Sequence, residues 1–181
     1  AQGIEIAANE RFNPADTSVT GQALKLMSAK PDAIFIAGSG TPAALPQKAL
    51  RERGYKGPIY QTHGVANNDF LRICGKDCEG TLLPVGPLQM ARSLPDSNPV
   101  KASALVYVEK YEAAHGEGSI SSFGGYAWDA GVLLQAAVPT ALKAAKPGTP
   151  EFRAELRNAL EGVKEAAGAT GIYTMSAEDH L

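Results

Sequence analysis

The feature that most constrains this chain is an uninterrupted apolar run at 33–37, Ala-Ile-Phe-Ile-Ala, with breakers on both sides. Lys30-Pro31-Asp32 precedes the run, and Gly38-Ser39-Gly40 follows it. A short apolar run between breakers is typical of a strand covered on both faces, as in parallel sheets. We therefore predict a buried strand here, followed by a helix across a glycine-containing loop.

Strand-like and helix-like segments alternate through the first 83 residues. Helices are expected at 19–29, at 42–53 and from Asn67 or Asn68 onward. Short strands are expected at 4–8, 58–61 and 81–83. Short connections and right-handed crossovers make such an alternation an α/β fold with a parallel sheet. The strand at 4–8 has no helix before it, so we expect the sheet to be incomplete, with a further βα unit upstream.

The organisation changes at Pro84-Val85-Gly86-Pro87. From there to Pro99 the chain is rich in Pro, Ser, Asp and Asn, which predicts a connector rather than an element. Helices are expected at 102–115, 124–145 and 151–160, and a final strand at 172–175. The first of these helices is expected to turn four residues inward, namely Leu105, Val106, Val108 and Tyr111.

Composition excludes several classes of protein. Of the 181 residues, 44% are hydrophobic and 20% are charged, which is ordinary for a globular protein and unlike a disordered one. The net charge of -2 and the scattered basic residues give no face for nucleic acid. No apolar run approaches the ~18 residues of a membrane span. No signal peptide is visible, which fits a cytoplasmic, a mature secreted or a trimmed chain.

The two cysteines, Cys74 and Cys78, stand four residues apart beside Gly75 and Gly80. They have no second cysteine pair or nearby histidine to complete a zinc site, so no metal is expected. A small-loop disulfide is favoured if the compartment oxidises thiols, and two free thiols are the alternative.

Two loops that follow strands and precede helices are the best candidates for a binding site, Gly38 to Ala43 and Thr62 to Asn67. Ligands of open α/β sheets bind at the carboxyl ends of the strands. Both loops place backbone N–H groups at a helix start, where they suit an anion or a carbonyl oxygen. Their polar side chains are Ser39, Thr41, Thr62, His63 and Asn67.

Two enzyme interpretations of these loops are weak. Residues 38–43 formally match the dinucleotide fingerprint G-x-G-x-x-G/A, but Pro42 removes one N–H and no carboxylate ends the next strand at Gln61-Thr62-His63. A hydrolase based on Ser39 and His63 lacks the G-x-S-x-G elbow and a third residue to orient the histidine. We therefore expect no catalysis and no cofactor.

The ordered set of segments resembles one family. The segments are Ala37-Gly-Ser-Gly-Thr-Pro42, Ile59-Tyr-Gln-Thr-His-Gly64, Glu79-Gly-Thr-Leu82, Tyr126-Ala-Trp-Asp-Ala130 and Gly171-Ile-Tyr-Thr-Met-Ser176. Together they resemble the branched-chain amino acid-type (leucine/isoleucine/valine) periplasmic solute-binding proteins of ABC transporters. The resemblance covers essentially the whole chain, although no single motif is diagnostic.

The resemblance implies a type I periplasmic binding protein fold, in which two α/β lobes enclose a ligand. Residues 1–87 would be the second lobe, a three-layer parallel-sheet lobe lacking its first βα unit, and 88–100 the hinge connector. Residues 101–170 would be an added helical segment, the remainder of the first lobe. Residues 171–181 would be a final strand and tail leading to a missing C-terminal segment. The chain would then be the C-terminal part of such a protein.

The resemblance also implies ligand contacts from Ser39, Gly40 and Thr41, with Thr62, His63 and Gly64 beside them. Phe123 would add an aromatic contact from the first lobe, with Tyr126 as its neighbour, although aromatic residues so spaced are more often core. Amino-acid-binding members carry an acidic residue at or near the position of His63, where it pairs with the ligand's ammonium. A histidine pairs poorly with an ammonium and suits a carboxylate.

The function implied by the resemblance is capture of a small organic acid, plausibly aromatic, or of an amino acid. The solute would pass to an ABC permease, and the protein would be periplasmic, with its signal peptide outside this chain. A nucleotide-cofactor-binding oxidoreductase domain is the alternative. The ligand-sensing domain of a receptor or transcription regulator is a second alternative, since it uses the same two-lobe fold.

Overall fold

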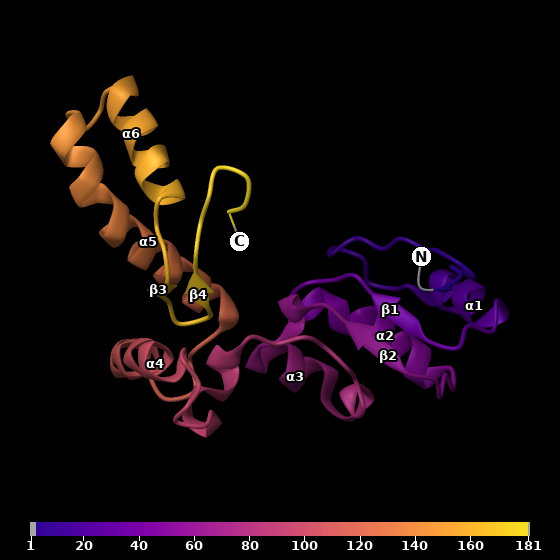
Figure 1. Ribbon diagram of the computed structural model, residues 1–181. Helices are drawn as coiled ribbons and strands as arrows, with labels where there is room; N and C mark the ends of the chain where they lie inside the picture. Colours follow the sequence, from indigo (N-terminus) through magenta and orange to yellow (C-terminus); the bar gives the residue numbers. More distant parts are fainter. Residues whose placement is uncertain (1–2, 181) are drawn as a thin grey trace. The chain divides into compact units, whose positions relative to one another are not determined.

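The computed structural model describes residues 3–180, so Ala1, Gln2 and Leu181 of the expected lobe and tail lie outside it. The chain divides into two compact units, with the boundary between Val85 and Gly86. Figure 1 shows the first unit in indigo to magenta and the second in rose to yellow. Within the described residues, no helix is both long and apolar enough to span a membrane.

A small parallel sheet lies at the centre of the first unit. β1 (Ile34–Ile36) pairs with β2 (Ile59–Gln61) in parallel, and Phe35 is opposite Tyr60. Leu82 extends the sheet by a single bridge beside Tyr60, because its N–H donates to the Ile59 carbonyl at 3.0 Å and its carbonyl accepts from Gln61 at 2.9 Å. The expected third strand at 81–83 is therefore reduced to one residue pair.

Among the described residues of this unit, three α-helices and three short 3₁₀ helices accompany the sheet. They are α1 (Thr20–Ser28), η1 (Thr41–Ala43), α2 (Ala44–Glu52), η2 (His63–Val65), α3 (Asn68–Cys74) and η3 (Gly75–Cys78). Asn67 is the N-cap of α3, since its Oδ1 accepts from the Phe70 N–H at 2.9 Å. Such a cap satisfies one of the N–H groups that a helix start leaves unpaired.

The core of the first unit lies on one face of the sheet. Its buried residues come from α1, α2 and both strands, namely Val19, Ala23, Ile34, Ile36, Ala49, Leu50, Tyr55 and Ile59. On the other face Phe35 is 64% exposed, and Tyr60 and Leu82 are also exposed. The prediction that the run at 33–37 is covered on both faces is therefore wrong, because within residues 3–85 this second face stays exposed.

The expected strand at 4–8 does not form. These residues have no regular secondary structure, and Ile4 and Ile6 are 85% and 78% exposed. A strand is stable only when a neighbour takes up its backbone hydrogen bonds and covers its side chains. Among the described residues no strand lies beside this segment, so its alternating pattern finds no sheet to join.

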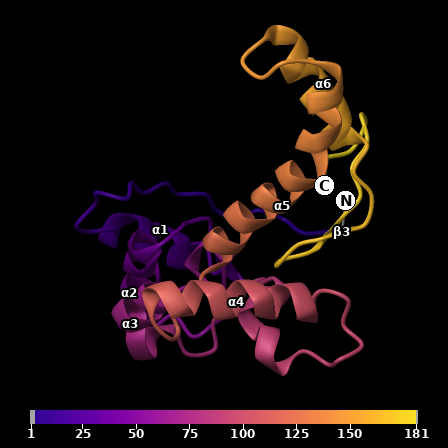
Figure 2. The ribbon, with the colours of Figure 1, turned by 90° about the vertical axis from the view of Figure 1, so that its left-hand side faces the viewer.

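The second unit is mostly helical. Its elements are η4 (Pro87–Ser93), α4 (Lys101–His115), α5 (Ser122–Ala144), α6 (Pro150–Glu161), β3 (Ala166–Ala167) and β4 (Ile172–Tyr173). Figures 1 and 2 both show α5 and α6 side by side. β3 and β4 form a short antiparallel hairpin, of which only the second strand was expected. Ser121 and Thr149 cap α5 and α6, since their hydroxyls accept from the N–H groups of Gly124 and Phe152.

Two details of the second unit differ from the sequence-based expectation. The connector expected at 88–100 includes most of η4, in which Leu88 and Ala91 are buried. These two residues are three positions apart, and this spacing places both side chains on one face of a 3₁₀ helix. In α4, Val106 is exposed, while Ala104, Tyr107 and Val108 are buried. The buried stripe follows the i, i+3, i+4 spacing and so passes beside Val106.

A buried carboxylate ties the hairpin to α5. Asp129 is 2% exposed and accepts from the Ala169 N–H, from the Thr170 N–H at 2.9 Å, from the Thr170 hydroxyl at 2.5 Å and from the Tyr173 hydroxyl at 2.8 Å. Buried carboxylates persist when several donors compensate for lost hydration. A Cβ at Gly168 would lie 2.5 Å from the Asp129 Cγ, so this approach requires a glycine.

Candidate functional site

The two loops expected to form a site lie against each other at the carboxyl ends of β1 and β2. The Gly40 N–H donates to the Gly64 carbonyl at 2.9 Å, and the Ser39 hydroxyl donates to the same carbonyl at 3.4 Å. The Thr62 hydroxyl donates to the Gly38 carbonyl. Parallel strands end at the same edge of a sheet, which is why segments 24 or 25 residues apart in sequence meet here.

Gly64 permits this close contact. A Cβ at that position would lie 2.7 Å from the Ser39 Oγ and 2.9 Å from its Cβ, closer than real Cβ atoms approach. The loop from Gly38 also needs a glycine at Gly40, whose φ is +62°. The structure thus brings together Ser39, Gly40, Thr62 and Gly64.

Most backbone N–H groups of these loops are already used within the protein. The Gly38 N–H donates to the Ile36 carbonyl at 3.0 Å, and the Ala43 N–H donates to the Gly40 carbonyl at 3.2 Å. The Gly64 N–H donates to the Thr62 hydroxyl at 3.2 Å. Fewer loop N–H groups than expected can therefore donate to a ligand. Within residues 3–180, the N–H groups of Ser39 and Thr41 have no acceptor and remain available.

His63 begins η2 and is exposed. It lines, with Thr62, a pocket of about 670 Å³ in the first unit. The other lining residues are mostly apolar. Phe35 and Tyr60 lie on the uncovered side of the sheet, Gln61 ends β2, and the segment after the sheet adds Leu82, Leu83 and Pro84. The pocket therefore combines the polar start of the second loop with an aromatic wall, and residues 38–43 of the first loop are not among its lining residues.

No carboxylate belongs to either loop. Residues 38–43 and 62–67 contain no Asp or Glu. The nearest acidic residue that follows is Asp69 in the first turn of α3, where it is exposed and pairs with Arg72 at 3.1 Å. The loops thus offer hydroxyl, amide and imidazole groups without a negative charge. Such a set favours a ligand carboxylate or carbonyl over an ammonium.

The contacts do not favour the two enzyme interpretations. Dinucleotide phosphates need free loop N–H groups, but those of Gly38 and Gly40 bind main-chain carbonyls. A nucleophilic serine needs a base, but the Ser39 hydroxyl donates to the Gly64 carbonyl. Among the residues that the structure describes, no cluster of three or more His, Cys, Asp or Glu side chains is placed to hold a metal ion.

The two aromatic candidates belong to the second unit. Phe123 and Tyr126 lie in the first turns of α5, and both are exposed. Their ring centroids are 6.2 Å apart with planes at 85°, an edge-to-face pair. The core interpretation that the sequence favoured for them is therefore wrong, since exposed rings on a helix start do not fill a core.

Sequence reasoning missed two buried glutamines behind the loops. Gln47 of α2 and Gln61 of β2 are 0% and 1% exposed, and they bind each other at 3.0 Å. Gln61 also donates to the Ala43 carbonyl at 3.2 Å. Glutamines are mostly exposed, so composition gives no warning of this pair. The available signal was the position of Gln61, two residues after Ile59 and thus on the same covered face.

Comparison with known proteins places these observations in a family. A family model described as periplasmic binding protein matches residues 1–181. A solved structure from Rhodopseudomonas palustris strain CGA009 is 50% identical with a TM-score of 0.93, covering 99% of this chain and 50% of that one. An extracellular ligand-binding receptor from R. palustris HaA2 is 49% identical with a TM-score of 0.89, covering 94% and 48%.

A more distant similarity points to the branched-chain amino acid type. A leucine binding protein, LivK, from Thermotoga maritima MSB8 is 26% identical with a TM-score of 0.74, covering 93% of this chain and 44% of that one. Among curated proteins, none matches. The chain thus spans about half the length of the solved structures that it resembles. The family resemblance and the incomplete fold expected from the sequence are both confirmed.

Proposed function

Because this chain belongs to the periplasmic binding protein family, we propose that it carries one side of the ligand site of a periplasmic solute-binding protein of an ABC transporter. The solute is a small organic carboxylate, with an aromatic acid as the leading candidate. The protein captures this solute and delivers it to a membrane permease. Its role is capture, without catalysis.

The observation that carries the proposal is the chemistry of the two touching loops. They present the N–H groups of Ser39 and Thr41 and the side chain of His63, with no carboxylate among them. A carboxylate ligand accepts hydrogen bonds from such donors. An amino acid also carries an ammonium, which would need an anionic partner that these loops do not supply.

The second side of the site is proposed to come from the second unit. Phe123 and Tyr126 are exposed aromatic residues on α5 and suit the ring of an aromatic acid. In this proposal residues 1–87 belong to one lobe, 88–100 to the hinge and 101–170 to the other lobe.

The proposed mechanism is closure around the solute. A ligand that contacts both lobes binds the closed form more tightly than the open form, so it shifts the population toward the closed form. The closed form then docks on the permease. Since relatives are about twice as long as this chain, the 181 residues alone are expected to bind the solute weakly or not at all.

The proposal is tested by calorimetry on the protein at the full length that its gene encodes. Benzoate is the probe for an aromatic acid, and leucine and valine are the probes for amino acids. We expect binding of benzoate and no heat from the amino acids. Tight binding of leucine without any response to benzoate would contradict the proposed ligand class. The ligand would then be an amino acid, as for the leucine binding protein LivK.

A matched pair of variants tests His63. His63→Glu places a negative charge beside the ligand carboxylate, and we expect the dissociation constant for benzoate to rise about tenfold or more. His63→Gln keeps a neutral donor of similar reach, and we expect a change of less than about threefold. Equal affinities of the Glu and Gln variants would remove His63 from the site.

A further inference from the structure

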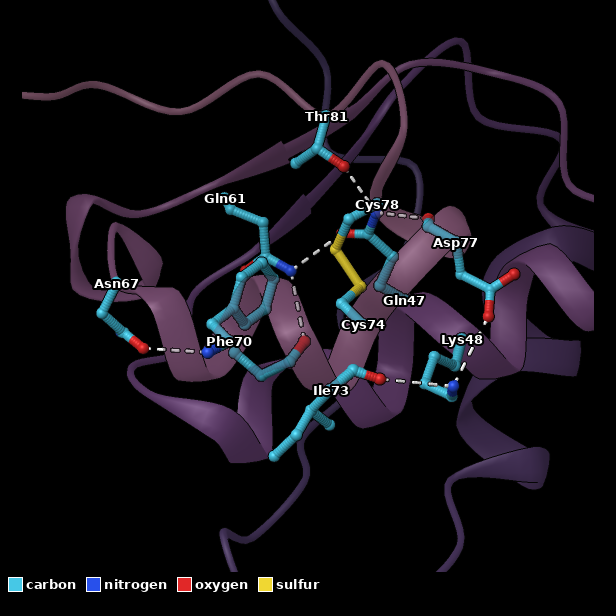
Figure 3. The surroundings of a disulfide bond; sticks show 11 residues. Gln47, Lys48, Gln61, Asn67, Phe70, Ile73, Cys74, Asp77, Cys78 and Thr81 are labelled. Atoms are coloured by element: carbon cyan, nitrogen blue, oxygen red, sulfur yellow. Dashed lines mark hydrogen bonds and ion pairs between the residues drawn. A yellow bond between two sulfur atoms is a disulfide. The ribbon is translucent and has the colours of Figure 1, made fainter. Parts of the chain in front are cut away.

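The disulfide between Cys74 and Cys78 closes a loop of five residues at the end of α3 (Figure 3). Cys74 is buried in a small core with Ala43, Ala44, Val65 and Phe70. The loop therefore lies next to η1 and η2, the 3₁₀ turns within the two site loops. Residues 75–78 themselves are η3, which contains no buried residue.

One buried side chain connects this loop to α2. The Gln47 Nε2 donates to the Asp77 carbonyl at 2.7 Å and to the Thr81 hydroxyl at 2.5 Å. Gln47 is fully buried, so water cannot replace these acceptors without opening the structure. Asp77 lies inside the disulfide loop, directly before Cys78, and the crosslink therefore restrains the position of its carbonyl.

A second buried side chain extends the network to the site. The Gln61 Nε2 donates to the Gln47 Oε1 at 3.0 Å and to the Ala43 carbonyl at 3.2 Å. The Gln61 Oε1 has no hydrogen-bond partner in the described structure, so these two bonds alone orient the side chain. Ala43 ends η1, the turn that follows the Gly38 loop, and Gln61 directly precedes Thr62 of the second loop.

We infer that the disulfide-closed loop 74–78 positions the two site loops through Gln47 and Gln61. Gln47 has no spare partner, because both of its donors and its one acceptor are used. A shift of the Asp77 carbonyl leaves a buried N–H unpaired, and the glutamines must then rearrange together. Gly75 at φ +56° and Gly80 at φ +76° leave the loop free to change conformation once the crosslink is open.

Lys48 supplies a matched control on the same helix. Its Nζ contacts the Asp77 Oδ2 at 3.6 Å and the Ile73 carbonyl at 3.5 Å (Figure 3). The side chain is partly exposed, and such pairs contribute little. Lys48 thus touches the same disulfide loop as Gln47, but its contacts do not continue to Gln61 or Ala43.

The test is amide hydrogen exchange by NMR on the 181-residue chain. The Gly40 N–H, which donates to the Gly64 carbonyl, reports on the contact between the loops. The Gly64 N–H, which donates to the Thr62 hydroxyl, reports on the second loop itself. We expect reduction with a phosphine to speed their exchange at least fivefold. The Ala23 N–H of α1, bonded to Val19 at 2.9 Å, is the reference and should change by less than twofold.

Two variants separate positioning from general stability. Gln47→Met keeps the volume and removes the polar links, and the oxidised variant should show the same loss of protection at Gly40 and Gly64. Lys48→Met should leave both amides as protected as in the wild type. Unchanged exchange after reduction and in Gln47→Met would overturn the inference. An equal loss of protection at Gly40 and Gly64 in Lys48→Met would also overturn it. So would an exchange rate of the Ala23 N–H that rises as much as those of Gly40 and Gly64.

A second arm concerns ligand affinity and rests on the proposed function. With the protein at its full encoded length, reduction should weaken benzoate binding at least threefold, and Gln47→Met should do the same. Equal affinity in both redox states would overturn the link to binding. If benzoate binds in neither state, the proposed function fails, whereas the exchange rates of Gly40 and Gly64 still decide whether the disulfide loop positions the site loops.

Discussion

At the scale of single residues, Gly64 determines how closely the two site loops approach. Gly64→Ala places a methyl group 2.7 Å from the Ser39 Oγ, so Ser39 or η2 must move. We expect the free energy of unfolding to fall by about 1–3 kcal/mol, as for other overpacked sites.

The matched control for this substitution is Gly21→Ala, which tests the same change in α1, where a Cβ meets nothing within 4 Å. It should be neutral or stabilise by up to about 1 kcal/mol, because alanine favours helices. Urea unfolding of both variants is the measurement. A Gly64→Ala variant as stable as the wild type would contradict the close packing of the loops.

A second residue-scale prediction concerns the Asp129 cluster. Burial raises the pKa of Tyr173 above its ordinary value, the Thr170 hydroxyl opposes this, and the Asp129 carboxylate adds to it. A raised pKa favours the neutral phenol in the folded state. This contribution to stability is therefore fully present below about pH 10 and is lost as pH rises through the higher folded pKa.

The expected result is a steeper loss of unfolding free energy above pH 10 in the wild type than in Tyr173→Phe, which cannot ionise. Denaturation by urea at several pH values between 8 and 11 measures the two slopes. Lysines titrate in the same range in both proteins, so only the difference between the slopes is informative. Identical slopes would mean that the Tyr173 phenol has the same pKa in the folded and unfolded chains.

Sequence reasoning located the loop residues but not the side chains that support them. Gly38 to Thr41 and Thr62 to Gly64 were found because breakers and small residues after a strand are a local signal. The Gln47–Gln61 pair depends on contacts 14 residues apart in the chain, and no local pattern reports such a contact. Phe123 and Tyr126 were misjudged as core because helical spacing predicts a shared face, without showing whether that face is covered.

At the scale of elements, helices were predicted better than strands. α1, α2, α4 and α6 begin and end within a few residues of the expected positions, because breakers and apolar spacing are local signals. Of these four, α6 also has a side-chain cap, Thr149. Strand pairing depends on neighbours far away in the sequence. Residues 4–6 do alternate between apolar and polar side chains, but residues 4–8 have no regular secondary structure, because no described strand lies beside them.

The uncovered face of the sheet yields a prediction at this scale. Phe35 is 64% exposed in this chain, whereas its neighbour Ile36 is 5% exposed. In a protein of the length of its relatives, we expect further chain to cover Phe35. Phe35→Ala should therefore cost less than about 0.5 kcal/mol in the 181-residue chain. It should cost about 3 kcal/mol or more in the full-length protein.

Ile36→Ala is the control, and it should cost about 2–4 kcal/mol at either length, since Ile36 is buried in both cases. Chemical unfolding of the four variant proteins provides the comparison. A small effect of Phe35→Ala at both lengths would show that this face stays open to solvent.

At the scale of the whole molecule, the family could be recognised from the sequence because its short segments occur in one order along the chain. The boundary between the two units was expected at residue 87 and lies between residues 85 and 86. Their roles as lobes, and the ligand contact of Phe123, remain predictions. Periodicity and capping are local signals, so they predict the elements of each unit but not which residues contact a ligand.

The position of the ligand carboxylate is the most direct test of the central claim. A crystal structure of the full-length protein with benzoate, or with the organic acid that binds most tightly in calorimetry, would measure it. We predict a carboxylate oxygen at about 2.7–3.2 Å from the backbone nitrogen of Ser39 or Thr41. We also predict the His63 ring beside it. A ligand bound elsewhere, or an ammonium group in place of the carboxylate at these loops, would contradict the account.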